Sequence, residues 1–319
     1  MSQSGNQEPN AILLYNRRTR RNGFDGVNTL EFYRLRWHFQ ALGRLSFAPG
    51  ASGNTVRGAF GVLLRQTASN EVYMRLFEPS RAAGASPSGL RDWPRPFLFR
   101  TAHLDGRQFA PGDAFHIDMH LFDPHPELLA AIRATFEGVG AAGIGPGRGR
   151  AALLRVEQLG VDESACETAN VPGPPSVVSL DPDPAGQAVR QVRLRFLTPT
   201  ELKGAAPDGG PAFGVLFARL RDRISTLRAF YGAGPLAIDF RALGERARAV
   251  ELVSSDLEWT TARRRSTRTG QTHPLGGFTG DAVYAGDLTE FLPWLRAARW
   301  TGVGRQTVWG KGDVRVEAP

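Results

Sequence analysis

The segment TGVGRQTVWGKGDVRV, residues 301–316, combines glycines with cationic and hydrogen-bonding side chains. Glycine lets backbone N–H groups approach a ligand closely, and successive N–H groups bind anions. Together with Arg305 and Lys311, this composition favours a phosphate-binding loop. Its glycines are Gly302, Gly304, Gly310 and Gly312. The alternative is a tight helix-to-strand turn that binds nothing.

A second glycine-rich segment, GAAGIGPGRG at 140–149, also precedes an expected strand, at 152–159. It carries Arg148 and is followed by Arg150. Two such loops at equivalent places, each with arginine, favour phosphate binding over a simple turn. Trp309, in the later loop, is a candidate for base stacking, but its position before a strand favours packing into the core.

Histidine is the side chain best suited to proton transfer near neutral pH, and the chain has six. In FYRLRWHFQA, at 32–41, His38 shares the polar face of an alternating strand with Arg34 and Arg36. That grouping predicts either a site for a reacting phosphate, with His38 as base or acid, or an ordinary solvated face. His273, expected at the tip of a basic hairpin, is a second candidate, as a catalyst or a contact.

The other histidines support no specific role. His116 and His120 share a strand face with Asp118, which superficially suggests a metal site, but the alternation with apolar neighbours favours a polar strand face. We expect no metal and no cofactor. No G-x-x-x-x-G-K-[ST] motif is present, which disfavours nucleotide hydrolysis.

The charge balance points to a polyanionic partner. Thirty-nine basic residues face 31 acidic ones, and only Lys203 and Lys311 are lysines. Arginine binds phosphate oxygens bidentately and stacks on bases, which favours nucleic acid. The densest run holds Arg263, Arg264, Arg265 and Arg268; strand alternation puts Arg263 and Arg265 on one face, for RNA contact or for protection of an edge strand.

The composition also bears on the cellular location of the protein. No apolar run approaches the length of a membrane span, the amino terminus lacks the apolar core of a signal peptide, and Cys166 is the single cysteine. We therefore expect a cytoplasmic protein without membrane contact.

The elements that position these groups follow one pattern twice. Strands at 32–41, 97–102, 114–122 and 152–159, with helices at 53–66 and 125–139, give β-α-β-β-α-β. Strands at 189–199, 256–268 and 276–288, helices at 211–232 and 289–300, and a final strand repeat it, with Pro293 expected to restart the last helix. The predicted fold class is α+β, with two tandem ferredoxin-like domains. We expect a basic arm at 1–28, domains at 29–160 and 189–319, and a proline-rich linker at 161–188.

Two stretches, 95–159 and 275–316, resemble the CRISPR-associated endoribonucleases of the repeat-associated mysterious protein (RAMP) superfamily. The pattern G-x-x-T-x-W-G-x-G before the last strand carries most of the similarity. The resemblance implies two ferredoxin-like domains and a carboxy-terminal glycine loop that contacts CRISPR repeat RNA. It also implies cleavage of precursor CRISPR RNA without metal, by attack of a 2′-hydroxyl that leaves 2′,3′-cyclic phosphate and 5′-hydroxyl ends.

One departure from the family keeps alternatives open. Several relatives carry a catalytic histidine just after the first helix, whereas QTASNEVYMRLFEPS, at 66–80, has none and offers Tyr73 and Arg75. The alternatives are a non-catalytic RAMP subunit of a CRISPR effector complex and a basic RNA-binding protein unrelated to CRISPR. The expected partners are repeat RNA and other effector subunits, and the chain is expected to be a monomer or homodimer.

Overall fold

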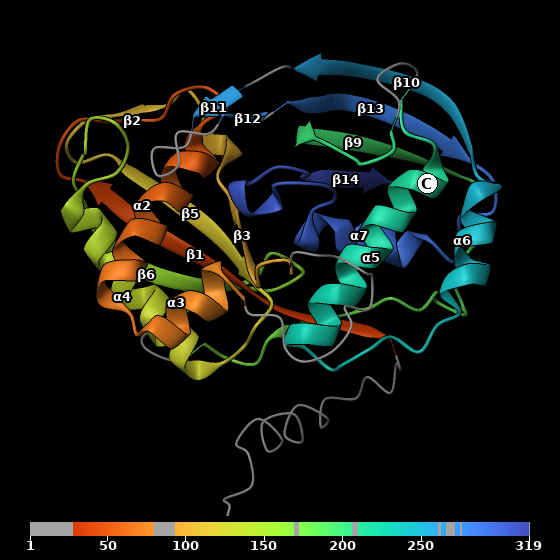
Figure 1. Ribbon diagram of the computed structural model, residues 1–319, viewed down its shortest axis with the longest axis horizontal. Coiled ribbons are helices and arrows are strands. Elements are labelled where there is room, and N and C mark those ends of the chain that lie inside the picture. The colour runs from red at the N-terminus through yellow and green to blue at the C-terminus, as the bar shows by residue number, and fades with distance from the viewer. Residues whose placement is uncertain are drawn as a thin grey trace, which may run out of the picture.

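The protein consists of two α+β halves packed side by side (Figure 1). This computed structural model describes residues 28–79, 93–168, 172–205, 210–260, 263–265, 272–274 and 276–318. The predicted basic arm, with Arg17, Arg18, Arg20 and Arg21, lies outside the described residues apart from position 28.

The amino-terminal half is built on one antiparallel sheet. Strand β1 (Thr29–Ala41) lies between β5 (Ala114–Leu121) and β6 (Ala151–Leu159), and β3 (Phe97–Arg100) pairs with the far side of β5. Helices α2 (Ser52–Thr67) and α4 (Pro126–Ala142) contribute Phe60 and Phe136 to the same core as the odd-numbered β1 residues from Tyr33 to Phe39. The rings of Trp37 and Phe136 stack at 4.4 Å. This is the ferredoxin-like arrangement that the alternation predicts. A short helix α3 (Asn70–Phe77), a 3-10 turn η2 (Ala102–Leu104) and a small ribbon of β2 (Leu45–Ser46) and β4 (Gln108–Phe109) are additions.

The carboxy-terminal half repeats the topology. Its sheet has the order β10 (Glu251–Thr260), β13 (Gly277–Ala285), β9 (Gln191–Thr200) and β14 (Val314–Glu317). Helices α5 (Phe213–Tyr231) and α7 (Leu292–Thr301) belong to its core. As predicted, Pro293 lies in the first turn of α7, where a missing N–H costs nothing. The tandem ferredoxin-like fold class is confirmed.

Helix α6 (Phe240–Arg248) was not expected from the sequence. Asp239 caps its amino terminus, because the carboxylate accepts hydrogen bonds from the N–H groups of Arg241 and Ala242. Aspartate is a preferred capping residue, so the sequence did contain a signal for the start of this helix. The expected hairpin at 256–288 is present as β10 and β13, with an inner ribbon of β11 (Arg263–Arg265) and β12 (Thr272–Pro274). Among the described residues no helix is long and apolar enough to cross a membrane.

The proline-rich segment at 161–188 takes part in the sheet. Strand β7 (Ala165–Glu167) pairs with β6, and β8 (Ser176–Ser179) pairs with the first residues of β1. Leu180, which follows, is fully buried in the carboxy-terminal core. The prolines mark an irregular connection, yet its residues are anchored to both halves.

Residues of both halves contribute to the carboxy-terminal hydrophobic core. Leu30 and Phe32 of β1, Leu98 of β3 and Phe122 belong to the same buried cluster as the carboxy-terminal helices. Figure 1 shows β1 running from the amino-terminal sheet to a position beside α5. The two halves are therefore rigidly docked, because separating them would expose these side chains to water.

The carboxy-terminal glycine loop lies at this junction. Its 3-10 turn η3 (Thr307–Trp309) packs against α2 and β3, and Val308 is buried in the amino-terminal core. A side chain at Gly53 would meet the Trp309 carbonyl oxygen at 2.1 Å, and one at Gly310 would meet the Phe99 carbonyl oxygen at 3.1 Å. Trp309 packs against the same core, as its position in the sequence favours.

We predict that Gly53→Ala lowers the free energy of unfolding by about 1–3 kcal/mol, because the new methyl group overlaps the Trp309 backbone. Gly58→Ala, in the same helix, is the matched control. Nothing lies within 4 Å of its added methyl group, so it should stabilise by about 0.5–1 kcal/mol. Urea denaturation checks both, and equal effects at the two positions would contradict the docking of η3 on α2.

Candidate active site

The face of the amino-terminal sheet opposite α2 and α4 carries the polar residues of the central strands. On β1 these are Arg34, Arg36 and His38, and their cross-strand partners on β5 are His120, Asp118 and His116. Directly paired residues in an antiparallel sheet share a face, so these six side chains form one surface. The grouping of His38 with arginines that the sequence predicts is therefore present, and β5 adds two histidines to it.

His38 forms a carboxylate dyad that the sequence analysis did not predict. Its Nε2 lies 2.7 Å from Glu157 Oε2, and Arg155 Nε donates to Glu157 Oε1 at 3.0 Å. Burial alone would raise the pKa of Glu157, but the hydrogen bonds from His38 and Arg155 outweigh it and lower that pKa. A carboxylate at this distance accepts a hydrogen bond from an imidazole N–H and so orients the ring.

His116 lies beside the dyad and is neutral at physiological pH. Its ring is 6.0 Å from that of His38 and stacks at 4.1 Å on that of His103. Burial lowers the pKa of His116 to about 4, helped by the neighbouring histidines and Arg36 and opposed by Asp118. Arg36 binds Asp118 bidentately, at 2.7 and 2.8 Å.

These groups suit general acid–base chemistry at a phosphate. His38 with Glu157 can accept a proton, while Arg36 and Arg155 bring positive charge to where a transition state would become negative. The side chains of His38 and Glu157 are 19% and 17% exposed, so the dyad is partly screened from water. Among the described residues no group of three or more His, Cys, Asp or Glu side chains could hold a metal ion.

Arg34 differs from its neighbours because it faces the carboxy-terminal half. It forms a 2.8 Å ion pair with Glu163, and its guanidinium lies 4.5 Å from the centre of the Trp300 ring. His120 is likewise covered, with Nδ1 at 2.8 Å from the Trp300 carbonyl oxygen. The docked α7 thus closes one end of the polar face and leaves the His38 end accessible.

The glycine loop at 302–312 has a different conformation from an open phosphate cradle. All four glycines have positive φ, and Gly312 lies so close to Val303 that a side chain would meet its carbonyl oxygen at 2.0 Å. Several of the loop's N–H groups donate to protein acceptors rather than facing solvent, including those of Gly302, Val303, Arg305, Gly310 and Gly312. In this conformation the lack of side chains at the glycines lets backbone segments pack directly against one another.

The two cations of that loop are placed differently. Arg305 is exposed and pairs with Glu201 at 2.7 Å. Lys311 is only 8% exposed, and its Nζ has no hydrogen-bond partner among the described residues. Burial lowers the pKa of Lys311 to about 8, although Glu201 opposes the shift.

The first glycine loop borders a groove between α2 and α4. Arg148 lines this groove together with Asn54, Thr55 and Gly145, and has φ 47°, a rare value for a residue with a side chain. Arg148 and Arg150 are both exposed. The arginines of this loop are therefore accessible to solvent, as Arg305 of the second loop is.

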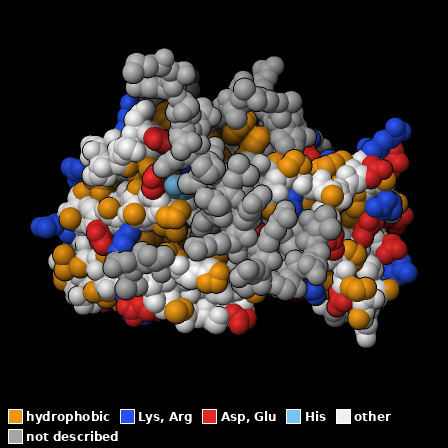
Figure 2. Space-filling view, turned by 90° about the horizontal axis from the view of Figure 1, so that it is seen from below, with side chains coloured by type: hydrophobic (Ala, Val, Ile, Leu, Met, Phe, Trp, Pro, Cys, Tyr) orange, Lys and Arg blue, Asp and Glu red, His pale blue; other side chains and the backbone are white. Residues whose placement is uncertain are grey.

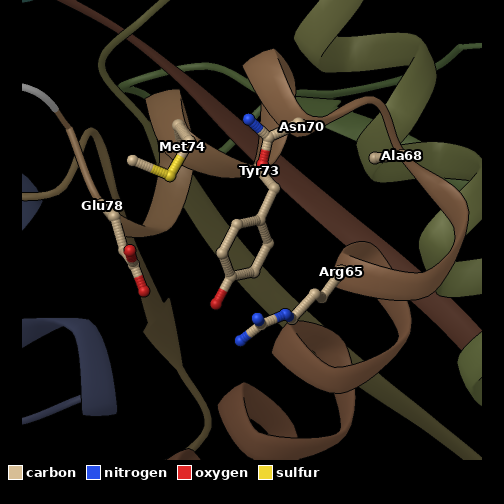
Figure 3. A pocket seen from close by; sticks show the side chains of 6 residues that line it. All are labelled: Arg65, Ala68, Asn70, Tyr73, Met74 and Glu78. Carbon is tan, nitrogen blue, oxygen red and sulfur yellow. The ribbon is translucent and has the colours of Figure 1, made fainter.

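Tyr73 does not share a site with His38. It lines a separate pocket with Arg65, Asn70, Met74 and Glu78, where its hydroxyl points toward Arg65 (Figure 3). The Tyr73 ring stacks on Phe77 at 5.5 Å and packs against the core on the helix-covered side of the sheet. The sheet therefore separates Tyr73 from the His38 dyad.

The basic hairpin is described only in its backbone. Arg264 lies opposite His273 in the β11–β12 ribbon, so His273 is beside the tip rather than on it. Arg268 lies outside the described residues. On the face shown in Figure 2, basic and acidic side chains are interspersed instead of forming one basic patch.

Three side chains near these candidates were not predicted from the sequence. Glu157 and Arg155 alternate on β6, a period-two signal that could have placed both on the face of His38. Trp259, at the end of β10, is 42% exposed although its ring contacts Phe278 at 5.2 Å. It therefore offers an aromatic surface next to the basic hairpin.

Fold and site together define a two-domain ferredoxin-like protein with proton-transfer groups on one sheet face. Comparison with known families gives the class: residues 194–314 match the CRISPR-associated endoribonuclease Cas6, and residues 30–172 match the AF_1859_N N-terminal domain. The carboxy-terminal half thus matches the Cas6 endoribonuclease family, in line with the resemblance to RAMP proteins.

Solved structures with the same fold extend over nearly the whole chain. The product complex of Cas6 (TTHB231), a Thermus thermophilus protein, is 18% identical with a TM-score of 0.56, covering 90% of this chain and 99% of that one. The Cas6 (TTHA0078) product complex is 19% identical with a TM-score of 0.50, covering 90% and 100%. A partial Cas6-RT-Cas1–Cas2 complex is 11% identical with a TM-score of 0.55, covering 91% and 46%. No curated protein matches this chain by sequence.

We predict that His116 makes the fold sensitive to acid. The unfolded chain protonates this imidazole near its ordinary pKa of 6.5, whereas the folded protein resists protonation down to about 4. The unfolded state therefore binds more protons in this window, and the free energy of unfolding falls as pH drops from 6.5 to 4. In His116→Gln, the loss in free energy of unfolding between pH 6.5 and 4 should be smaller than in the wild type by about 1–2 kcal/mol. Urea titrations across this range check it, with His125→Gln as the control; an unchanged pH slope would contradict the assignment.

We also predict that Lys311→Met stabilises the protein by about 1–3 kcal/mol at pH 7, since a buried ammonium without a hydrogen-bond partner is removed. Between pH 8 and 10.5 the unfolded wild type binds more protons than the folded form, so its stability rises with pH. The difference between variant and wild type should therefore shrink over that range. Destabilisation at pH 7 would show that Lys311 has a favourable partner.

Proposed function

We propose that this chain is a metal-independent endoribonuclease that binds CRISPR repeat RNA in the cytoplasm and cleaves the precursor transcript once per repeat. The observation that carries the proposal is the His38–Glu157 dyad flanked by Arg36, in a chain whose carboxy-terminal half matches Cas6. The solved structures of Cas6 (TTHB231) and Cas6 (TTHA0078) are product complexes, which agrees with this activity.

The proposed reaction is an internal transfer at one phosphodiester. His38 Nδ1 takes the proton of the 2′-hydroxyl, and the 2′-oxygen attacks the adjacent phosphorus. The bond from phosphorus to the 5′-oxygen breaks, and that oxygen receives a proton from water. The products end in a 2′,3′-cyclic phosphate and a 5′-hydroxyl, and His38 then releases its proton to solvent. Glu157 stabilises the imidazolium that forms at His38, while Arg36 and Arg155 stabilise the charge on the phosphorane.

RNA contacts are proposed at the cations that the structure leaves exposed. Arg148, Arg150 and Arg305 are exposed, and the hairpin with Arg263, Arg265, Arg268 and His273 supplies further candidates. Each arginine that neutralises a phosphate should make binding more sensitive to salt. The glycines of the 302–312 loop then act by holding this surface in place, and a direct contact between RNA and Lys311 requires the loop to open. Trp259 adds a stacking surface.

A second candidate function is a non-catalytic subunit that holds guide RNA. It is favoured by one observation: Arg34, Arg36 and His38 are all already paired with carboxylates of the protein. Both candidates bind repeat RNA, so only a cleavage assay separates them. Oligomeric state, monomer or homodimer, and other CRISPR subunits as partners remain part of the proposal.

We predict that labelled host repeat RNA is cut at one position in EDTA, and that a single 2′-deoxy substitution just 5′ of the cut abolishes cleavage. His38→Ala should slow the cut about 10²–10⁴-fold, and Glu157→Gln should slow it less while shifting the pH–rate profile. His125→Ala, at the start of α4, and Arg241→Ala, an exposed residue on α6, are the matched controls. Repeat-selective binding without any cut would establish the guide-holding subunit instead.

A further inference from the structure

Five arginines converge where the two halves meet, and they are referred to here as the arginine cluster. They come from five elements: β1, the end of β3, α5, α7 and β14, with residues Arg34, Arg100, Arg223, Arg299 and Arg315 respectively. Among the described residues the carboxylates in ion pairs with this cluster are Asp313 and Glu163. The cluster therefore holds more positive than negative charge.

Arg100 is the cluster member with two buried nitrogens that lack partners. It is 9% exposed, and neither Nε nor Nη1 has a hydrogen-bond partner among the described residues. Its Nη2 donates to the Arg299 carbonyl oxygen at 3.0 Å, and Asp313 lies 3.7 Å from Nε. Buried guanidinium N–H groups are nearly always satisfied, so these two atoms indicate a missing acceptor.

The other members repeat this pattern. Each has at least one buried nitrogen without a hydrogen-bond partner: Nε of Arg34, Nη2 of Arg223, Nε of Arg299 and Nη1 of Arg315. Burial lowers the pKa of Arg223 to about 9, with a further contribution from Arg100. Burial also lowers the pKa of Arg315, and the charges of Arg100 and Arg34 add to this shift. The guanidinium groups thus repel one another in a partly desolvated space, which an anion would relieve.

Glu163 sits at the solvent side of the cluster and bridges two of its members. One carboxylate oxygen pairs with Arg34 at 2.8 Å, and the other pairs with Arg299. Its side chain is 48% exposed, and its backbone is left-handed, with φ 66°. A residue with a side chain adopts this conformation at a cost, unless its surroundings hold it there.

The turn that carries Glu163 is fixed on its other side. The Asp162 carboxylate accepts hydrogen bonds from both the N–H and the hydroxyl of Ser164, and Gly160 accepts one from Arg34. The turn therefore presents a single carboxylate to two arginines that belong to different halves. A phosphate group offers the same oxygens with more charge, and arginine binds it bidentately.

We propose that the arginine cluster is a phosphate-binding site that Glu163 occupies until a phosphate group displaces it. The phosphate belongs either to an RNA backbone or to a free phosphoryl ligand. Arg34 is four residues from His38 on β1, about 13 Å along the strand, so a bound RNA could reach both. The inference that the phosphate belongs to RNA rests on the proposed function, whereas the inference that the cluster binds phosphate does not.

The test measures binding by the full-length protein and its Glu163→Gln variant. One probe is inorganic phosphate, read as a shift in Tm against chloride at equal ionic strength. The other is repeat RNA with the single 2′-deoxy substitution, read as Kd at several salt concentrations. Glu163→Gln should tighten the binding of phosphate about tenfold, and Arg299→Ala or Arg315→Ala should abolish the effect. Glu163→Gly, which also relieves the left-handed backbone, should act like Glu163→Gln.

Glu290→Gln is the matched control, because Glu290 forms a comparable pair with the exposed Arg246 at 2.5 and 2.7 Å and should change neither affinity. Tighter binding of both probes identifies the RNA backbone as the source, and tighter binding of phosphate alone identifies a free phosphoryl ligand. Unchanged affinity for both probes in both Glu163 variants would overturn the site. Cleavage by these variants is scored separately, so failure of the proposed nuclease would leave the binding result intact.

Discussion

The packing of backbone against backbone between the two halves governs most of this structure. The 3-10 turn at Thr307–Trp309 reaches the first turn of α2 at a distance that only glycine at position 53 permits. This contact, with the shared core around Leu30 and Phe32, fixes the angle between the sheets. As a result α7 covers one end of the amino-terminal polar face and leaves the other end, with His38, accessible.

Internal ion pairs offset part of the repulsion in a chain with a net charge of +8. Much of its arginine is committed to internal pairs, such as Arg36 with Asp118 and Arg75 with Asp123. Among the cations that are left, two groups stand out. One group is exposed around the first glycine loop, and the other is confined between the halves with few carboxylates. Charge that could not be neutralised locally is thus found where the fold brings distant segments together.

Local patterns allowed the fold class to be predicted, because period-two alternation on β1 and β9 and helical spacing on α2 and α5 each reflect one buried face. The surroundings of His38 could be predicted only in part. Its neighbours on β1 follow from the same strand, but the Glu157 partner depends on strand order and register across 119 residues. The packing contacts of the glycine loop were not readable, because its need for small residues arises from Phe99, Val303 and Glu201, and no local pattern links Phe99 or Glu201 to it. Proline content likewise predicted a linker at 161–188 without showing that this segment pairs with two strands.

That pairing has a consequence for synthesis on the ribosome. Residues 29–32, at the start of β1, pair with Ser176–Ser179, and Leu30 and Phe32 are buried against the helices near the carboxy terminus. None of these contacts can form until those later segments have been synthesised. The amino-terminal half therefore cannot complete its sheet when its own six ferredoxin elements have emerged. Contacts this distant in sequence slow folding and leave an apolar strand end exposed during translation. A truncation at 160 would keep that end uncovered permanently, so the two halves are interdependent in assembly although each has a complete topology of its own.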